Sequence, residues 1–489
     1  MRLRSLVVAS VLFLTGCTPA ANTAAPISSI DEVLTQTVTW TDCEDGFECA
    51  TVGAPLDWLN PSDEFLPIAI IRKAEASSKP VIFVNPGGPG VSGVTWFREG
   101  YNTLGSKELR NEFQVIAFDP RGVGKSAGVV CPSQEIKDRV YYEQSPFEYG
   151  SQADLEYTTK ALTEFAEDCQ KSGFDPAYFN TQQAARDLEL LRELVGGESL
   201  NYLGFSYGTL LGSTYAALFP DKVGKLVLDG AIDPTKSEGE MLLSQVAGFD
   251  AAFKAYLAHC VEQLQCPFNG DAESALGVVA QFLAEREKSA LPTQLGRELS
   301  LQAALSGIIA ALYSEQSWIY LSQAFDEALD GDGTTLLLLA DFYNNRELDA
   351  GYTSNLNEAN RAISCADARI SEAESAALNE RFTQQSQVFG KYFMQPHLAC
   401  VGWPEGKSMV PLNFTVKLAN APLVVGTTGD PATPYAQAQA LSELLDGAVL
   451  LTLKADRHTA YGSSVCIDSI VEAYFRGSDI GSKDQTCNR

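Results

Sequence analysis

Residues 204–208 read GFSYG, a G-x-S-x-G sequence near the middle of this 489-residue chain. An apolar run at residues 200–204 precedes it, and a helical pattern at residues 210–219 follows it. Between a strand and a helix, this motif predicts a sharp turn that exposes the serine hydroxyl above the sheet. Glycine allows such a turn because it has no Cβ atom. We therefore expect Ser206 to be a nucleophile at a helix N-terminus, where developing negative charge is favoured.

Apolar runs rich in β-branched residues recur on both sides of the motif, and helical patterns separate many of them. The runs cover residues 67–72, 80–84, 113–118, 200–204, 225–228, 422–426 and 448–453. The helical patterns include residues 184–195, 210–219 and 435–445. Nearly continuous apolar strands that alternate with helices predict an α/β fold in which helices cover a mostly parallel sheet.

The strand-like runs stop between residues 236 and 396. Helical patterns dominate there, at residues 241–264, 301–312, 319–329 and 372–382. We interpret residues 236–396 as a helical cap inserted into the sheet domain. The core would then consist of a first part, residues 31–235, and a C-terminal part, residues 397–489.

A serine nucleophile needs a base, and the base needs an acid that orients it. In sheets of this kind the three groups follow the chain order Ser, Asp, His. His458 comes just after the last apolar run, whereas His259 and His397 lie in or beside the cap and are expected to be structural. The acid expected is Asp430, which directly precedes a helical pattern, and the alternative is Asp229 at the end of an earlier run.

Two backbone N–H groups should bind the oxyanion of the reaction intermediate. One belongs to Tyr207, the residue after the nucleophile. The other should come from the loop at residues 85–90, which reads NPGGPG after an apolar run. We expect the donor to be Gly88, with Gly87 as the alternative.

The sequence argues against several other function classes. The net charge of −27 disfavours binding to nucleic acid. The sequence GPGVSG at residues 88–93 matches a dinucleotide fingerprint, but its glycines serve the oxyanion loop equally well. Gly124-Lys125-Ser126 resembles the end of a P-loop, yet Asp119 stands where its first glycine belongs. No CxxC or HExxH sequence is present, so we expect no metal and no cofactor.

The N-terminus indicates export. Basic residues and a short apolar run end in Leu14-Thr15-Gly16-Cys17, which resembles a bacterial lipobox. We expect residues 1–16 to be a signal peptide, Cys17 to carry lipid, and residues 17–30 to be a tether. The protein would be anchored at the outer face of the cell membrane. The alternative is ordinary secretion with cleavage near Ala25.

Ten cysteines remain after Cys17, an even number that indicates disulfides in an exported protein. Sequential pairing is the simplest arrangement, and several free buried thiols are the alternative. The expected pairs are Cys43–Cys49, Cys131–Cys169, Cys260–Cys266, Cys365–Cys400 and Cys466–Cys487.

Residues 85–93, 118–126 and 201–234 resemble exported tripeptidyl aminopeptidases of the α/β-hydrolase fold, which are relatives of prolyl aminopeptidases. The similarity continues through GDPATPY at residues 429–435 and HTAYGSSVC at residues 458–466. The resemblance implies an eight-stranded, mostly parallel sheet with a helical cap. It also implies a Ser-Asp-His triad and release of short peptides from free N-termini.

Residue by residue, the triad of this family falls on Ser206, Asp430 and His458. Thr433 also matches and is expected to help position the active-site loop. Two features differ from many relatives: Asp456-Arg457 replaces glycine before the base, and Asn85-Pro86 replaces His-Gly at the start of the oxyanion loop.

The substrates implied are peptide or protein N-termini. An exopeptidase must bind the substrate ammonium, and we expect an Asp or Glu of the cap to do so. Two other hypotheses remain: an esterase or lipase that uses the same triad, and a non-catalytic surface protein that binds a partner.

Overall fold

The computed structural model describes residues 29–74 and 79–488. The expected signal peptide and the lipidation site Cys17 lie outside the described residues. Within them, no helix combines the length and the apolar character needed to cross a membrane.

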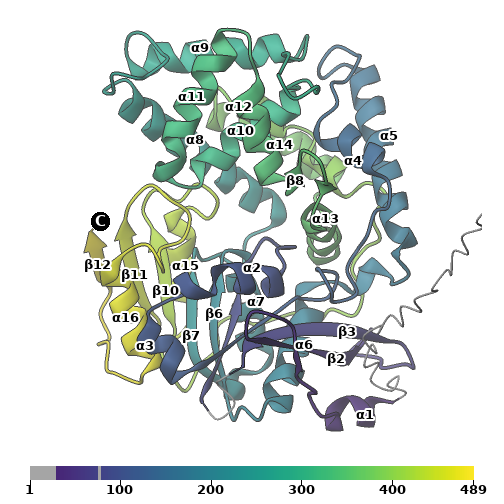
Figure 1. Cartoon of the computed structure of the whole chain (residues 1–489), viewed down its shortest axis with the longest axis vertical. Helices are drawn as coiled ribbons and strands as arrows, with labels where there is room; N and C mark the ends of the chain where they lie inside the picture. Colours follow the sequence, from purple (N-terminus) through teal and green to yellow (C-terminus); the bar gives the residue numbers. More distant parts are fainter. Residues whose placement is uncertain (1–28, 75–78, 489) are drawn as a thin grey trace, which may run out of the picture.

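A ten-stranded sheet forms the centre of the lower half of the molecule in Figure 1. Its order is β1-β2-β3-β5-β4-β6-β7-β10-β11-β12. The strands are β1 (Thr41–Asp42), β2 (Phe47–Pro55), β3 (Phe65–Lys73), β4 (Val81–Asn85), β5 (Gln114–Phe118), β6 (Leu200–Phe205), β7 (Val223–Asp229), β10 (Leu423–Thr427), β11 (Val449–Lys454) and β12 (Gln485–Asn488).

The sheet has two more strands than the eight expected. The additional strands are the edge strands β1 and β12, which are two and four residues long and contain mostly polar residues. Neither has the apolar run by which a buried strand is recognised. The pairs β1–β2, β2–β3 and β3–β5 are antiparallel, and all other pairs are parallel.

Side chains alternate between two hydrophobic cores along each central strand. In β4, Phe83 packs into the core on one face, whereas Ile82 and Val84 pack into the core on the other. This alternation places one apolar layer on each face of the sheet. The helices that flank the sheet are α1 (Ile30–Thr35), α2 (Gly93–Gly100), α3 (Lys107–Glu112), α6 (Thr181–Leu194), α7 (Tyr207–Leu218), α15 (Tyr435–Leu444) and α16 (Val465–Phe475).

The strand order brings distant loops together at one edge. Strand β6 pairs with β4 on one side and with β7 on the other. The carboxyl ends of these parallel strands meet at the same edge, where open α/β sheets bind their ligands. The loop after β4, the turn after β6 and the end of β7 are therefore neighbours.

Helices dominate the segment between β7 and β10, and Figure 1 shows them stacked above the sheet. They are α8 (Glu238–Cys260), α9 (Ala272–Arg286), α10 (Leu301–Leu312), α11 (Trp318–Leu329), α12 (Thr334–Tyr343), α13 (Leu356–Asp367) and α14 (Glu372–Gln385). Helices α8 to α12 build a hydrophobic core of their own around Phe253, Tyr256 and Phe325, whereas α13 packs into a core of the sheet through Ala359 and Ile363. A small hairpin, β8 (Arg346–Glu347) and β9 (Gly351–Tyr352), interrupts the cap helices, so the segment is not free of strands as the sequence pattern predicted.

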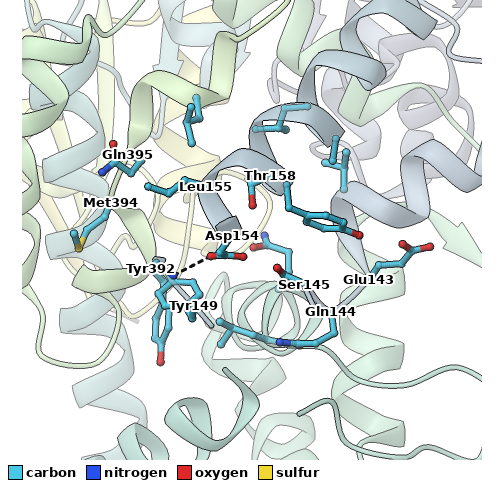
Figure 2. A pocket seen from close by; sticks show the side chains of 18 of the residues that line it. Glu143, Gln144, Ser145, Tyr149, Asp154, Leu155, Thr158, Tyr392, Met394 and Gln395 are labelled. Carbon is cyan, nitrogen blue, oxygen red and sulfur yellow. Dashed lines mark hydrogen bonds between the residues drawn. The ribbon is translucent and has the colours of Figure 1, made fainter. Parts of the chain in front are cut away.

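A second helical segment contributes to the cap side, and the sequence pattern did not separate it from the core. Helices α4 (Gln134–Tyr141) and α5 (Gln152–Cys169) leave the sheet after β5 and lie beside the cap (Figure 1). Tyr142 packs into the hydrophobic core of the cap, and Asp138 forms an ion pair with Arg346. A cavity of about 280 Å³ lies between α5 and the segment around Tyr392. Side chains that line it are drawn in Figure 2.

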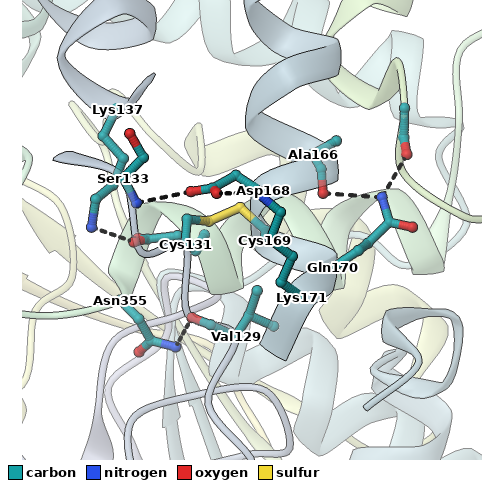
Figure 3. The surroundings of a disulfide bond; sticks show 12 residues. Val129, Cys131, Ser133, Lys137, Ala166, Asp168, Cys169, Gln170, Lys171 and Asn355 are labelled. Carbon is teal, nitrogen blue, oxygen red and sulfur yellow. Dashed lines mark hydrogen bonds and ion pairs between the residues drawn. A yellow bond between two sulfur atoms is a disulfide. The ribbon is translucent and has the colours of Figure 1, made fainter. Parts of the chain in front are cut away.

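Five disulfides join the cysteines in the expected sequential order. Figure 3 shows Cys131–Cys169, which ties the end of α5 to the segment before α4. Beside it, Asp168 accepts a hydrogen bond from Ser133 N at 2.9 Å. This disulfide therefore joins the two ends of the α4–α5 segment to each other, and both of its cysteines are buried in a core of the sheet.

Candidate active site

Ser206 occupies the turn between β6 and α7. Its backbone has φ 54° and ψ −122°, a conformation that residues with a side chain rarely adopt. Such a conformation costs about 1–3 kcal/mol and is retained where the surrounding structure imposes it. The Ser206 N–H donates to the carbonyl of Asp229 at 2.8 Å, which fixes the turn to the end of β7. The side chain is half-buried, as expected of a nucleophile at a strained strand-to-helix turn.

His458 and Asp430 are brought together at the edge of the sheet. His458 Nδ1 lies 2.9 Å from both carboxylate oxygens of Asp430. Asp430 comes from the loop after β10, and His458 from the loop after β11. The structure thus places Asp430, and not the alternative Asp229, in hydrogen-bond contact with the imidazole.

Four further donors hold the carboxylate of Asp430. They are the N–H groups of Ala432, Thr433 and Thr459, at 3.0, 2.8 and 3.2 Å, and the hydroxyl of Thr433 at 3.1 Å. Thr433 Oγ1 is also 3.4 Å from His458 Nδ1. Thr433 thus contacts both members of the pair, and its positioning role stays a prediction.

Two opposing effects act on the imidazole. Burial alone would lower the pKa of His458, but the charge of Asp430 and its hydrogen bond outweigh burial and raise the pKa above 6.5. A protonated imidazole cannot accept the Ser206 proton, so activity requires the neutral form. We expect kcat/KM to rise with pH, with a midpoint above 6.5, in a profile measured between about pH 5 and about pH 9. A midpoint that does not fall in Asp430→Asn would contradict this origin of the shift.

Asp229 supports the loop after β11 that carries His458, which we call the base loop, but it forms no hydrogen bond with the imidazole in the described part of the chain. Its carboxylate accepts from Ala460 N at 3.0 Å and from Tyr461 N at 2.7 Å. Burial raises the pKa of Asp229 to about 6, against the lowering effect of these two N–H groups. Because its backbone carbonyl binds Ser206 N, Asp229 links the turn of the nucleophile to the loop of the base.

The described residues contain no hydrogen bond between the Ser206 hydroxyl and His458. Asp430 and His458 are in contact, and Ser206 lies at the same edge of the sheet without this hydrogen bond to His458. Catalytic hydrogen bonds are often long in unliganded enzymes and shorten when substrate binds.

The oxyanion loop lies against the nucleophile turn. A Cβ atom on Gly87 would clash with the Phe205 carbonyl and come within 3.0 Å of Ser206 Cβ, so only glycine fits. The Gly87 N–H donates to Asn85 Oδ1 at 3.0 Å and is thus already used. Tyr207 N is the first N–H of α7 and has no partner within that helix. The Gly87 N–H is thus less available than that of Gly88, and the assignment of Gly88 and Tyr207 as oxyanion donors stays a prediction.

The cap is fastened directly to the base loop. His458 N donates to the carbonyl of Tyr313 at 2.8 Å, and Glu315 N donates to Asp456 O at 3.0 Å. Between them, Ser314 and Arg457 form an antiparallel bridge. The Asp456-Arg457 sequence therefore forms a short strand-like pairing with the segment that follows α10, and this pairing holds the base in place.

Tyr313 also supports the imidazole through its ring. The two rings meet edge to face, with centroids 5.4 Å apart and an interplanar angle of 84°. We expect Tyr313→Ala to lower kcat by about 3- to 10-fold, the value of one aromatic contact, and to shift the pH midpoint. Tyr313→Phe keeps the ring and should retain kcat. A loss confined to KM would assign Tyr313 to substrate binding instead.

The remaining candidate residues have structural contacts. His259 packs against Trp318, and His397 bonds Ser375 at 2.9 Å. In the turn after β5, Arg121 is buried and paired with Asp187. Within residues 29–74 and 79–488, no group of three or more His, Cys, Asp or Glu side chains is arranged to hold a metal ion.

Comparison with known proteins gives two family matches. The alpha/beta hydrolase fold model matches residues 80–289, and a model described as TAP-like protein matches residues 386–487. Together the two matches cover the nucleophile turn and both residues of the acid–base pair.

Full-length relatives are also found. Serine protease Hip1 of Mycobacterium tuberculosis is 32% identical over 98% of this chain and 96% of its own length. Carboxylesterase B of the same species is 33% identical over 94% of this chain and 90% of its own length. Tripeptidyl aminopeptidase of Streptomyces coelicolor is 28% identical over 92% and 86%.

Proposed function

Because this chain belongs to the α/β-hydrolase family, in its TAP-like branch, and is a serine hydrolase, we propose that it is an exopeptidase of the cell envelope that releases tripeptides from free N-termini. In the proposed reaction, His458 takes the proton of Ser206, which attacks the scissile carbonyl. The N–H groups of Tyr207 and Gly88 bind the oxyanion, and His458 then protonates the leaving amine. Asp430 orients the imidazole and stabilises its charged form.

A group of cap carboxylates beside the nucleophile turn carries the exopeptidase proposal. Asp367 accepts from Thr181 N and Oγ1, both at 2.6 Å, and Thr181 Oγ1 lies 2.7 Å from Tyr207 Oη. Burial raises the pKa of Asp367 to about 7, and the charge of Glu238 adds to the rise. Tyr207 is the residue after the nucleophile, so Thr181 and Tyr207 connect Asp367 to the turn of Ser206.

Two more carboxylates extend this group. Desolvation, together with the charge of Glu374, raises the pKa of Glu238. Helices α8 and α14 meet closely here, because a Cβ atom on Gly239 would lie 2.6 Å from Glu374 Oε1. Mutual repulsion of three carboxylates would be relieved by a cation. The ammonium group of a peptide N-terminus supplies that cation.

Peptides with free and acetylated N-termini test the proposal. We expect acetylation to lower kcat/KM at least about 30-fold, because it removes the positive charge that would pair with a partly buried carboxylate. Asp367→Asn and Glu374→Gln should raise KM for the free peptide and leave the acetylated peptide unaffected. Glu372→Gln is the matched control, because Glu372 is exposed in the same helical turn. Equal rates for both peptides would exclude an exopeptidase.

The length of the released peptide requires a separate measurement. Digestion of a peptide library, with the products identified by mass spectrometry, should give tripeptides as the main released fragments. Single amino acids as the main products would instead indicate an aminopeptidase. A relative named carboxylesterase B makes ester hydrolysis the second candidate function. Hydrolysis of short esters together with intact peptides would favour that candidate.

The cell-envelope part of the proposal depends on Cys17. The lipobox-like sequence before it supports thioether lipidation and anchoring at the outer face of the membrane. Labelled fatty acid should be incorporated into the wild-type protein and not into Cys17→Ser, which should appear in the medium. Incorporation that survives the substitution would refute the anchor.

A further inference from the structure

A cavity of about 310 Å³ lies beside His458, between helix α2 and the loop of the base. Its lining is mainly apolar and aromatic and includes Pro86, Trp96, Leu104, Phe205, His458 and Tyr461. We call it the Trp96 cavity. It is separate from the cavity between α5 and the cap shown in Figure 2, with which it shares no lining residue.

The aromatic wall of the Trp96 cavity is built before any ligand arrives. Phe205 packs against Trp96 with ring centroids 5.8 Å apart and stacks on Tyr461 at 6.5 Å. Tyr461 is held by the carboxylate of Asp229 at its N–H and by Glu472 at its hydroxyl. Gly105, with φ +65°, closes the other side, because a Cβ atom there would clash with Tyr461 Oη.

The position of the Trp96 cavity identifies the part of the substrate that can enter it. Pro86 belongs to the oxyanion loop, Phe205 precedes the nucleophile, and His458 is the base. In acyl transfer by a serine triad, the base donates its proton to the leaving amine. The leaving group must therefore lie next to His458, which also lines this cavity.

We propose that the Trp96 cavity binds the side chain of the residue that follows the scissile bond, and that it selects apolar and aromatic side chains there. This inference rests on the proposed peptidase function and extends it to the leaving group. Apart from His458, none of the lining residues has an acidic or basic side chain. A charged side chain of the substrate would therefore lose water in this cavity without gaining an oppositely charged partner. The volume suffices, since a cavity of about 150 Å³ already holds benzene.

Peptides that differ only in the residue after the scissile bond test the assignment. For wild type, we expect kcat/KM to be about 10- to 100-fold higher with Phe or Leu at this position than with Gly, and lowest with Asp. Trp96→Ala should reduce the preference for Phe over Gly by about 10-fold. Trp96→Phe, which keeps an aromatic ring, should retain most of it. The rate of Ser206 labelling by a fluorophosphonate shows whether each variant keeps an intact site.

Matched control variants show whether the preference arises in the Trp96 cavity itself. Met394→Ala alters the cavity between α5 and the cap and should leave the preference unchanged. Leu104→Ala provides a second variant of the Trp96 cavity if Trp96→Ala does not fold. A flat preference in wild type would overturn the inference. The inference would also be overturned if Trp96→Ala changed the preference for the residue before the scissile bond and left the preference for the residue after it unchanged.

If the protein is not a peptidase, the result differs from the one expected when only the assignment of the Trp96 cavity is wrong. If wild type cleaves no peptide but hydrolyses esters, the peptidase proposal is wrong. The cavity is then tested with benzyl and methyl esters of one acid, because an alcohol leaves from the same side. Preference for benzyl that Trp96→Ala removes would support the leaving-group assignment, and equal rates would refute it.

Discussion

Replacing Ser206 by alanine is expected to lower kcat by roughly 10⁵- to 10⁶-fold, close to complete loss of the triad contribution. The reason is that no other group is placed on the strained turn between β6 and α7 to form the acyl bond. The substitution removes one oxygen from a half-buried side chain, so the fold should be retained. Hydrolysis of a tripeptidyl p-nitroanilide gives kcat, and a fluorophosphonate probe reports the nucleophile directly.

Ser213 provides a matched control for this variant. It lies in the same helix α7, it is buried, and its hydroxyl donates only to the carbonyl of Leu210 in that helix. Ser213→Ala should therefore keep both turnover and labelling. Full activity or normal labelling in Ser206→Ala would mean that the nucleophile has been assigned to the wrong residue.

The second large effect is expected for Asp430→Asn, with a loss of about 10⁴-fold in kcat. An asparagine amide can donate to His458 Nδ1, which stabilises the wrong tautomer and removes the charge that stabilises the imidazolium. The same substitution should lower the pH midpoint of kcat/KM, because Asp430 contributes more than Asp229 to raising the pKa of His458. Steady-state kinetics across pH would measure both effects on one set of samples.

Asp229→Asn is the comparison that decides between the two carboxylates. Asp229 Oδ2 accepts from both Ala460 N and Tyr461 N, and an asparagine oxygen can keep these bonds. We expect a loss of only about 10-fold, from a less firmly held base loop. If Asp229→Asn is as damaging as Asp430→Asn, the acid role is shared or has been assigned to the wrong residue.

Local patterns were sufficient for the main features of the fold. The G-x-S-x-G turn, the buried strands and the long cap helices each have a signal within a few neighbouring residues, because side-chain period and glycine content are local properties. Helix α10, for example, begins and ends at the residues expected from the pattern. Edge strands β1 and β12 lack such a signal, since short polar strands form only when a neighbouring strand offers hydrogen bonds.

The sequence by itself determined which residue types could form the site and in what order they occur along the chain. Only the tertiary structure decided between Asp430 and Asp229, because the choice depends on which carboxylate reaches His458 across the sheet edge. It likewise decided that Asn85 accepts a hydrogen bond from the N–H of Gly87, and that Ser314, just after α10, pairs with Arg457. These contacts join segments far apart in the chain, and no property of a short stretch specifies them.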